Sequence, residues 1–259
     1  MIREARRAIA QETVEIIERG GYGEVAFPDA ITAAVAGTRL YRPGDPVPAP
    51  TGARGVASIA VTNETSLAAA RRLGVRSACL NFASARSPGG GFLNGAEAQE
   101  ESLARASALY PSLRAADEFY AYHRANPDPM YSDRVIYSPG VPVFRDDDGT
   151  LLAEPYPVSF LTSAAPNRTA IAPEHQPEIP AVIARRAGRV LAIAAAHGHR
   201  RLVLGAWGCG VFGNDPATVA EIFATALREG PAFDEVVFAV LDRAPGTPTY
   251  QAFVDALPR

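Results

Sequence analysis

The pattern in this sequence most suited to chemistry is a run of three glycines followed, seven residues later, by a glutamine and two glutamates. These residues are Gly89, Gly90, Gly91, Gln99, Glu100 and Glu101. A carboxyl group can protonate a leaving oxygen, and a second carboxyl group can hold a hydroxyl. Because adjacent helical residues project about 100° apart, we expect the two glutamates to have different tasks.

A structural interpretation of the same residues remains open. Successive glycines are entropically costly and could form a flexible linker, while acidic side chains in a first helical turn are favoured by the helix dipole. Spacing alone favours this interpretation for the two glutamates. Long flexible loops between a strand and a helix are uncommon, however, which argues against a linker and for a backbone that approaches a ligand.

A second glycine-rich segment lies between Gly205 and Asp215, where a strand is expected to lead into a helix. Such loops expose backbone N–H groups to anions. The segment lacks both the P-loop signature and the glycine spacing of a dinucleotide fold. Since Asp215 is expected to cap the helix, anion contacts are expected from Gly208, Cys209, Gly210, Val211, Phe212 and Gly213. The alternative is a tight turn around a buried Trp207.

The hydrophobic pattern predicts strands that alternate with helices. Strands are expected at residues 57–61, 76–82, 135–137, 158–162, 202–204 and 236–241. Helices are expected at residues 3–19, 63–73, 97–122, 180–197 and 250–256, and one is expected to start after Asp215. This alternation indicates an α/β fold whose sheet is covered on both faces. Ligands bind such sheets beyond the carboxyl ends of the strands, which is where both glycine-rich loops are expected.

Composition limits the classes of protein that the chain can represent. Its 259 residues, 47% of them hydrophobic, suit one α/β domain spanning residues 1–259, with residues 1–55 as an N-terminal extension. Residues 42–55 are rich in proline and glycine and are expected to form a loop or arm. The net charge of −3 argues against a general DNA or RNA binder. The sequence shows no signal peptide and no membrane span, so we expect a cytoplasmic protein. It also shows no metal-ligand spacing.

The glycine run and the Gln-Glu-Glu triplet, together with Asn81-Phe82-Ala83, resemble the signature of poly(ADP-ribose) glycohydrolases. Further stretches resemble the bacterial type of that family, namely residues 131–134, 136–144, 164–167 and 205–214. The resemblance implies a macrodomain-like three-layer α/β/α fold with a mixed sheet.

For function, the resemblance implies hydrolysis of ribose–ribose O-glycosidic bonds to release ADP-ribose, in an exo mode. Glu101 would be the general acid and base, Glu100 would bind ligand beside it, and Asn81, Gln99 and the two glycine loops would contact substrate. The chemistry requires no metal and no redox cofactor. The expected partners are poly(ADP-ribose), ADP-ribose and ADP-ribosylated proteins, and the protein is expected to be a monomer that binds neither membranes nor nucleic acid.

Two other functions remain open. A macrodomain that only binds ADP-ribose would share the fold and the phosphate loop, but it would not need the Gln-Glu-Glu triplet. A hydrolase of mono-ADP-ribose on protein side chains would use the same groups. An NAD-dependent enzyme is not supported, because the glycine spacing differs from that of dinucleotide-binding folds.

Overall fold

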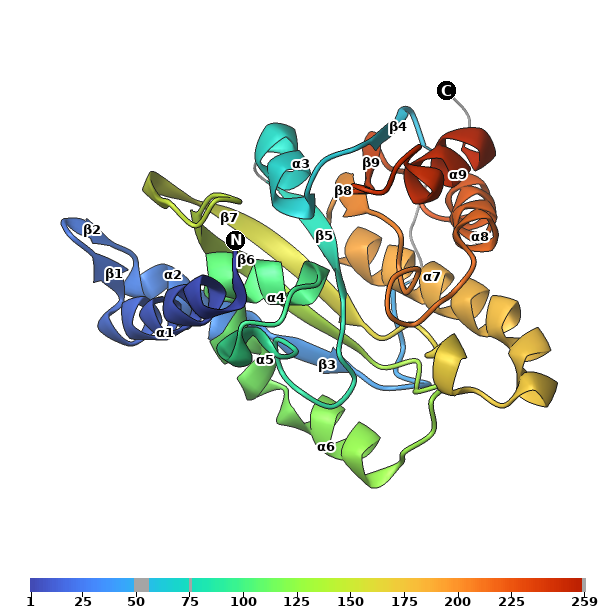
Figure 1. Ribbon diagram of the computed structural model, residues 1–259, viewed down its shortest axis with the longest axis horizontal. Helices are drawn as coiled ribbons and strands as arrows, with labels where there is room; N and C mark the ends of the chain where they lie inside the picture. Colours follow the sequence, from blue (N-terminus) through green and yellow to red (C-terminus); the bar gives the residue numbers. More distant parts are fainter. Residues whose placement is uncertain (49–55, 75, 258–259) are drawn as a thin grey trace.

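The computed structural model describes residues 1–48, 56–74 and 76–257. In this part of the chain seven strands form one mixed sheet, in the order β3-β6-β7-β5-β8-β9-β4 (Figure 1). Strands β4, β5, β7, β8 and β9 run parallel, whereas β6 is antiparallel to both of its neighbours. The strands are β1 (Gly21–Tyr22), β2 (Val25–Ala26), β3 (Arg39–Tyr41), β4 (Ile59–Thr62), β5 (Ser77–Phe82), β6 (Val135–Arg145), β7 (Leu151–Ser163), β8 (Arg201–Leu204) and β9 (Glu235–Ala239).

Side chains alternate between the two faces of this sheet, as the two-residue period of a strand requires. In β5, Cys79 packs into one hydrophobic cluster, while Ala78 and Leu80 pack into the other. The same division separates Val203 from its neighbours Leu202 and Leu204 in β8. Both faces are therefore apolar and must be covered by helices.

The helices cover the sheet in two layers, which confirms the predicted α/β/α arrangement. Helices α7, α8 and α9 pack on one face, and α2 to α5 pack on the other (Figure 1). The α-helices are α1 (Arg3–Arg19), α2 (Pro28–Gly37), α3 (Ser66–Leu73), α4 (Gln99–Ala106), α5 (Leu109–Ala115), α6 (Asp117–Ala125), α7 (Ile179–Ala196), α8 (Pro216–Glu229) and α9 (Pro248–Ala256). Short 3₁₀ helices are η1 (Phe92–Asn94), η2 (Arg168–Ala170) and η3 (Pro173–Glu178).

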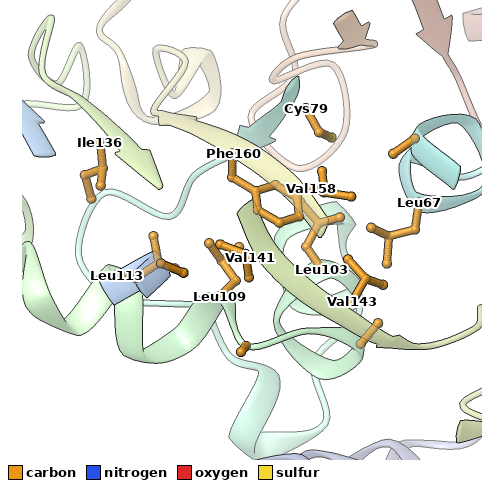
Figure 2. Packing of buried hydrophobic residues seen from close by; sticks show 14 of the residues in the cluster. Leu67, Cys79, Leu103, Leu109, Leu113, Ile136, Val141, Val143, Val158 and Phe160 are labelled. Carbon is orange, nitrogen blue, oxygen red and sulfur yellow. The ribbon is translucent and has the colours of Figure 1, made fainter. Parts of the chain in front are cut away.

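The layer that carries α4 and α5 is held by branched and aromatic side chains from several elements. Figure 2 shows Leu103 of α4 and Leu109 of α5 packing toward Phe160 of β7. All three side chains are at most 1% exposed. Each such burial contributes about 1.5–3 kcal/mol relative to an exposed side chain, so this packing fixes the start of α4 against the sheet.

The stretch expected to be helical over residues 97–122 is helical with breaks, because it forms α4, α5 and α6. The first break falls at Ser107, whose extended backbone forms an isolated β-bridge with Val143. The next amide, that of Ala108, donates to the carbonyl of Pro142 at 2.9 Å. Pairing with β6 therefore takes the chain out of the helix, and the local pattern gives no sign of this.

Other expectations were closer to the structure. Helix α1 spans the predicted residues 3–19 and ends at Gly20, which adopts the left-handed conformation with φ 76°. Strands β6 and β7 are longer than predicted, and α2 and β3 were not predicted. Residues 42–48 lie outside helices and strands, as expected, whereas residues 49–55 of the same segment lie outside the described residues. None of the described helices combines the length and the apolar character needed to cross a membrane.

Candidate active site

The two glycine-rich loops meet at the carboxyl ends of neighbouring parallel strands. The first loop (residues 83–98) follows β5, and the second (residues 205–215) follows β8. The carbonyl of Ser163, the last residue of β7, accepts hydrogen bonds from the Ala83 amide at 3.2 Å and from Trp207 Nε1 at 3.0 Å. One oxygen thus ties both loops to the sheet, in the position where such folds bind ligands.

Glu101 lies against the glycine run of the first loop. Its Oε1 accepts a hydrogen bond from the Gly91 amide at 2.9 Å. Gly90 has φ +59°, and a Cβ built there would lie 2.3 Å from Glu101 Oε1 and 3.4 Å from Glu100 Oε2. Both carboxyl groups therefore lie beside a backbone position that only glycine can occupy without displacing Glu101.

Glu100 points into the protein and is only 2% exposed. Its Oε2 accepts from the Ser84 amide at 2.5 Å, and its Oε1 accepts from Asn81 Nδ2 at 3.3 Å. Burial raises the pKa of Glu100 to about 8, and the negative charge of Glu101 adds to this, while the hydrogen bonds to the carboxyl group oppose it. At neutral pH the side chain is therefore mostly protonated.

Asn81, near the end of β5, connects Glu100 to the sheet. Its Nδ2 also donates to Thr162 Oγ1 at 3.1 Å, and the side chain is fully buried. Its Oδ1 has no hydrogen-bond partner among the described residues. A buried unpaired acceptor is costly, and no group among the described residues offsets this cost.

Gln99 connects α4 to β5 through its side-chain amide. Its Oε1 accepts from the Phe82 amide at 2.9 Å, and its Nε2 donates to the carbonyl of Leu80 at 2.7 Å and to Ser66 Oγ at 3.1 Å. The pairing of β5 with β8 ends at Cys79, so Gln99 bonds to β5 at residues beyond those that pair with β8. This geometry places the two glutamates that follow Gln99.

The second loop is stabilised by its own side chains and by η2, from which the Thr169 amide donates to the carbonyl of Phe212 at 3.3 Å and Arg168 donates to the carbonyl of Gly213 at 3.2 Å. Trp207 is fully buried, and Asn214 donates through Nδ2 to the carbonyls of Pro166 at 2.9 Å and Gly208 at 3.2 Å. Gly208 has φ +73°, and a Cβ there would lie 2.4 Å from Asn214 Nδ2. Asp215 caps α8 by accepting from the Thr218 amide at 2.8 Å, as predicted. The tight turn around Trp207 therefore exists, and it still leaves the tip of the loop open.

At that tip the backbone amides of Gly210, Val211 and Phe212 donate to no acceptor among the described residues. The Val211 side chain is 83% exposed, so this residue can contribute to a ligand site only through its backbone or by apolar contact. Burial raises the pKa of the Cys209 thiol to about 12, and Cys209 Sγ lies 3.8 Å from the carbonyl of Trp207. The thiol therefore stays protonated and faces inward.

An aromatic pair stands beside the second loop. The rings of Phe212 and Tyr131 lie 5.9 Å apart between centroids. Tyr131 has φ +56°, an uncommon left-handed conformation for a bulky residue. Ser132, the next residue, donates through its amide to His123 Nε2 at 3.2 Å. Burial lowers the pKa of His123 to about 4, so its neutral ring can accept this bond.

Sequence reasoning missed several residues that complete the site. Arg105 follows Glu101 by one helical turn, is buried, and donates to the carbonyl of Ala96 at 2.6 Å. Its four-residue spacing from Glu101 could have indicated it. Ser84 bonds to Glu100 through its backbone amide, and His123 accepts a hydrogen bond from the Ser132 amide. No sequence pattern indicates such contacts.

Comparisons with known proteins match the chain as a whole to one family. The family model for the microbial-type PARG catalytic domain matches residues 10–146. A crystal structure of poly(ADP-ribose) glycohydrolase from Thermomonospora curvata, bound to the inhibitor ADP-HPD, is 59% identical to the chain, with a TM-score of 0.92. That match covers 97% of this chain and 99% of the other. The enzyme from Deinococcus radiodurans in complex with ADP-ribose is 47% identical, with a TM-score of 0.84 over 90% of this chain and 98% of the other. Among curated proteins, none matches the chain.

Proposed function

The chain belongs to the microbial-type poly(ADP-ribose) glycohydrolase family, and from this premise we propose that Glu101 is the acid that protonates the leaving oxygen when a ribose–ribose bond is cut. The activity follows from the family, because both a catalytic-domain model and highly identical glycohydrolase structures match the chain. The roles of the individual residues are the part that we propose.

One observation carries the role of Glu101, namely its contact with the glycine run. The Gly91 amide binds Glu101 Oε1 at 2.9 Å, and Gly90 leaves no space for a side chain between the loop and the carboxyl group. Unlike Glu100, Glu101 is partly exposed. It can therefore reach a substrate oxygen that the glycine backbone brings close.

Hydrolysis of the O-glycosidic bond requires a proton on the leaving oxygen and passes through an oxocarbenium-like transition state. Glu101 supplies that proton and then, as a carboxylate, accepts one from the attacking water. The C–O bond to the leaving ribose breaks, the water oxygen bonds to the anomeric carbon, and Glu101 returns to its starting protonation state. One well-placed acid of this kind contributes roughly 10²–10⁴-fold to the rate.

Glu100 and Asn81 hold ribose hydroxyls in this proposal. A protonated Glu100 can donate a hydrogen bond as well as accept one, and the unpaired Oδ1 of Asn81 can accept from a hydroxyl. Gln99, which we expected to contact substrate, supports the site by positioning α4, since its amide is already bonded to Phe82, Leu80 and Ser66.

The second loop holds the diphosphate of ADP-ribose. The amides of Gly210, Val211 and Phe212 are available at its tip, and backbone N–H groups in such a loop bind phosphate well. The rings of Phe212 and Tyr131 then form an apolar wall for the ribose or adenine of the ligand. Gly208 and Gly213, both at positive φ, shape the turn that presents these amides.

We further propose that residues 1–259 act as one catalytic domain that works as a monomer in the cytoplasm on ADP-ribosylated proteins, and that cleavage is exo-acting. Exo cleavage releases free ADP-ribose from chain ends, whereas endo cleavage first releases oligomers. The size distribution of early products therefore distinguishes the two modes.

The test is to incubate purified protein with poly(ADP-ribose), resolve the products, and compare the wild type with Glu101→Gln. The expected result is free ADP-ribose from the wild type and a loss of roughly 10²–10⁴-fold in kcat for the variant. Calorimetric binding of ADP-ribose should be similar in both proteins, which shows that the variant is folded.

Each alternative gives a different outcome. Equal release by both proteins would remove Glu101 from the mechanism. Binding of ADP-ribose without cleavage by either protein would indicate a binding module. Cleavage of mono-ADP-ribosylated protein in preference to polymer would indicate the side-chain hydrolase.

A further inference from the structure

Helix α1 contacts the loop that carries the catalytic glycines, although it lies about 90 residues away in sequence. Arg3 Nε donates to the carbonyl of Asn94 at 3.0 Å, and Arg6 Nε donates to the carbonyl of Gly95 at 2.9 Å. Gly95 has φ +72°, and a Cβ there would lie 2.3 Å from the carbonyl oxygen of Arg3. The backbones of α1 and of the first loop are thus in close contact (Figure 1).

Two arginines hold the segment that joins the glycine run to the glutamates. Arg6 NH1 lies 2.6 Å from Glu97 Oε2, and the Arg6 side chain is only 14% exposed. From the other side, Arg105 donates to the carbonyl of Ala96 at 2.6 Å. Residues 95–97 therefore lie between two guanidinium groups, one from α1 and one from α4.

The charge on Arg105 is disfavoured by burial and by Arg6, and favoured by the two nearby glutamates. Burial and the positive charge of Arg6 therefore lower the pKa of Arg105, while the negative charges of Glu101 and Glu97 oppose this shift. Thr13 of α1 donates through Oγ1 to the carbonyl of Arg105 at 2.6 Å. Helix α1 therefore acts on the loop directly through Arg6, and also through the backbone of α4.

An apolar contact runs parallel to these polar ones. Ala10 of α1 packs with Phe92 and Ala104 in a small separate cluster, and all three are at most 1% exposed. A Cβ on Gly89 would lie 3.0 Å from the ring of Phe92. Phe92 thus fills the space between α1 and the first glycine of the run.

We propose that α1 is a brace for the catalytic loop and that Arg6 is a positioning residue for hydrolysis. The inference rests on the proposed role of Glu101. The first loop spans 16 residues between β5 and α4, which is long for a strand-to-helix connection. Catalysis needs the Gly91 amide and the Glu101 carboxyl group at a fixed distance, and small displacements are costly. Arg6 keeps this distance fixed by holding Gly95 and Glu97, which lie between Gly91 and Glu101 in the sequence.

The test compares Arg6→Gln with Arg7→Gln on poly(ADP-ribose). Arg7 is the matched control, because it is adjacent and exposed, and its side chain has no ion pair or hydrogen bond with any described residue. Arg6→Gln should lower kcat by about tenfold and leave KM within about twofold, since the loop geometry changes and the phosphate loop does not. Arg7→Gln should leave both parameters unchanged.

Two further readouts separate positioning from a general loss of structure. In hydrogen–deuterium exchange, the amides of residues 89–95 should exchange faster in Arg6→Gln, while those of β5 and β8 keep their protection. Arg6→Lys, which retains the charge opposite Glu97, should recover part of kcat. Glu97→Gln combined with Arg6→Gln should cost less than the sum of the two single effects, because the two residues form one ion pair.

The proposal is overturned if Arg6→Gln leaves kcat within about twofold, or if kcat, ADP-ribose affinity and thermal stability all fall together. The variant Glu101→Gln keeps this test separate from the proposed mechanism. If Glu101→Gln remains active, the acid is misassigned whatever Arg6 does. If Glu101→Gln is inactive and Arg6→Gln behaves as wild type, only the brace is refuted.

Discussion

The two glycine-rich loops of this molecule use glycine for different purposes. In the first loop, the Gly91 amide binds the Glu101 carboxyl group, and Gly90 leaves no space for a side chain beside that group. In the second loop, Gly208 and Gly213 shape a turn whose tip amides have no acceptor among the described residues. One loop positions the carboxyl groups, and the tip of the other is open to a ligand.

The loops also differ in how they are held. The first is held by side chains from other elements, among them Arg6 of α1 and Gln99 of α4. The second is held by its own Trp207 and Asn214, which donate to carbonyls just after β7 or at its end, and by two residues of η2. The difference indicates that catalytic geometry depends on the layer around α4, whereas anion binding depends on the segment that follows β7.

The strongest test of this contrast is Gly90→Ala. The new methyl group would lie 2.3 Å from Glu101 Oε1 at a backbone with φ +59°, so the carboxyl group must move. We expect kcat to fall by about 100-fold, with ADP-ribose affinity nearly unchanged, because the phosphate loop is untouched. Steady-state kinetics and calorimetric binding measure the two effects separately.

The control is Gly188→Ala in α7, where a Cβ has open space. This variant should retain full activity, and it should gain up to about 1 kcal/mol of stability because alanine favours a helix more than glycine does. Equal losses of kcat and affinity in Gly90→Ala would mean that the first loop also binds the diphosphate.

A second test uses pH, because the buried carboxyl group of Glu100 is bonded to the first loop and not to the second. The pKa of Glu100 is raised from 4.5 to about 8, so between these values the folded protein keeps a proton that the unfolded chain has lost. The contribution of this group to the free energy of unfolding therefore falls as pH rises through that window. Between about pH 5 and about pH 8 we expect a loss of roughly 3–4 kcal/mol in the wild type that Glu100→Gln does not show.

The comparison with Glu100→Gln is needed because His123 contributes in the opposite direction. Its pKa is lowered from 6.5 to about 4, so its contribution to stability rises with pH between these values. Both proteins share this term, and it cancels in their difference. Identical pH profiles of urea unfolding for the two proteins would show that Glu100 titrates normally.

The smallest effect is expected for Gly208→Ala in the second loop. A Cβ there meets Asn214 Nδ2 at 2.4 Å and Ala165 Cβ at 2.6 Å with φ +73°, so the turn must shift. We expect ADP-ribose affinity to fall by about tenfold, with kcat at saturating polymer reduced much less. A variant that keeps its affinity but loses kcat would place this loop in catalysis and remove the contrast.

Much of the sheet was predictable because buried strands have continuous apolar runs. Strands β5, β8 and β9 lie within one or two residues of the expected ranges, and α1 matches its range. The break at Ser107 was not predictable, since it depends on pairing with Val143 in a strand that comes later in the chain. Helix α2 is short and its apolar residues are mostly alanines, so its periodicity is weak.

The residue types of the site were predictable from the sequence, but the role of each residue was less so. Glu100, Glu101 and the glycine run are adjacent, as their spacing suggested. That Glu100 would be the buried and protonated member of the pair depends on the Ser84 amide and on Asn81, which tertiary structure brings to it. The contacts of Arg3 and Arg6 with the first loop span about 90 residues, and no local pattern can encode them.

The way Gln99 binds β5 has a consequence for how this loop can change in length. The loop is fixed at its start by Ser84, which binds Glu100, and at its end by Gln99, which binds Phe82 and Leu80. Between these points Arg86 and Ser87 are exposed. Inserted residues there would bulge into solvent at little free-energy cost and leave the carboxyl groups in register with the strand. The loop can therefore gain new surface there without loss of chemistry, provided that the Gly90 amide keeps its bond to the carbonyl of Ser87 at 2.9 Å.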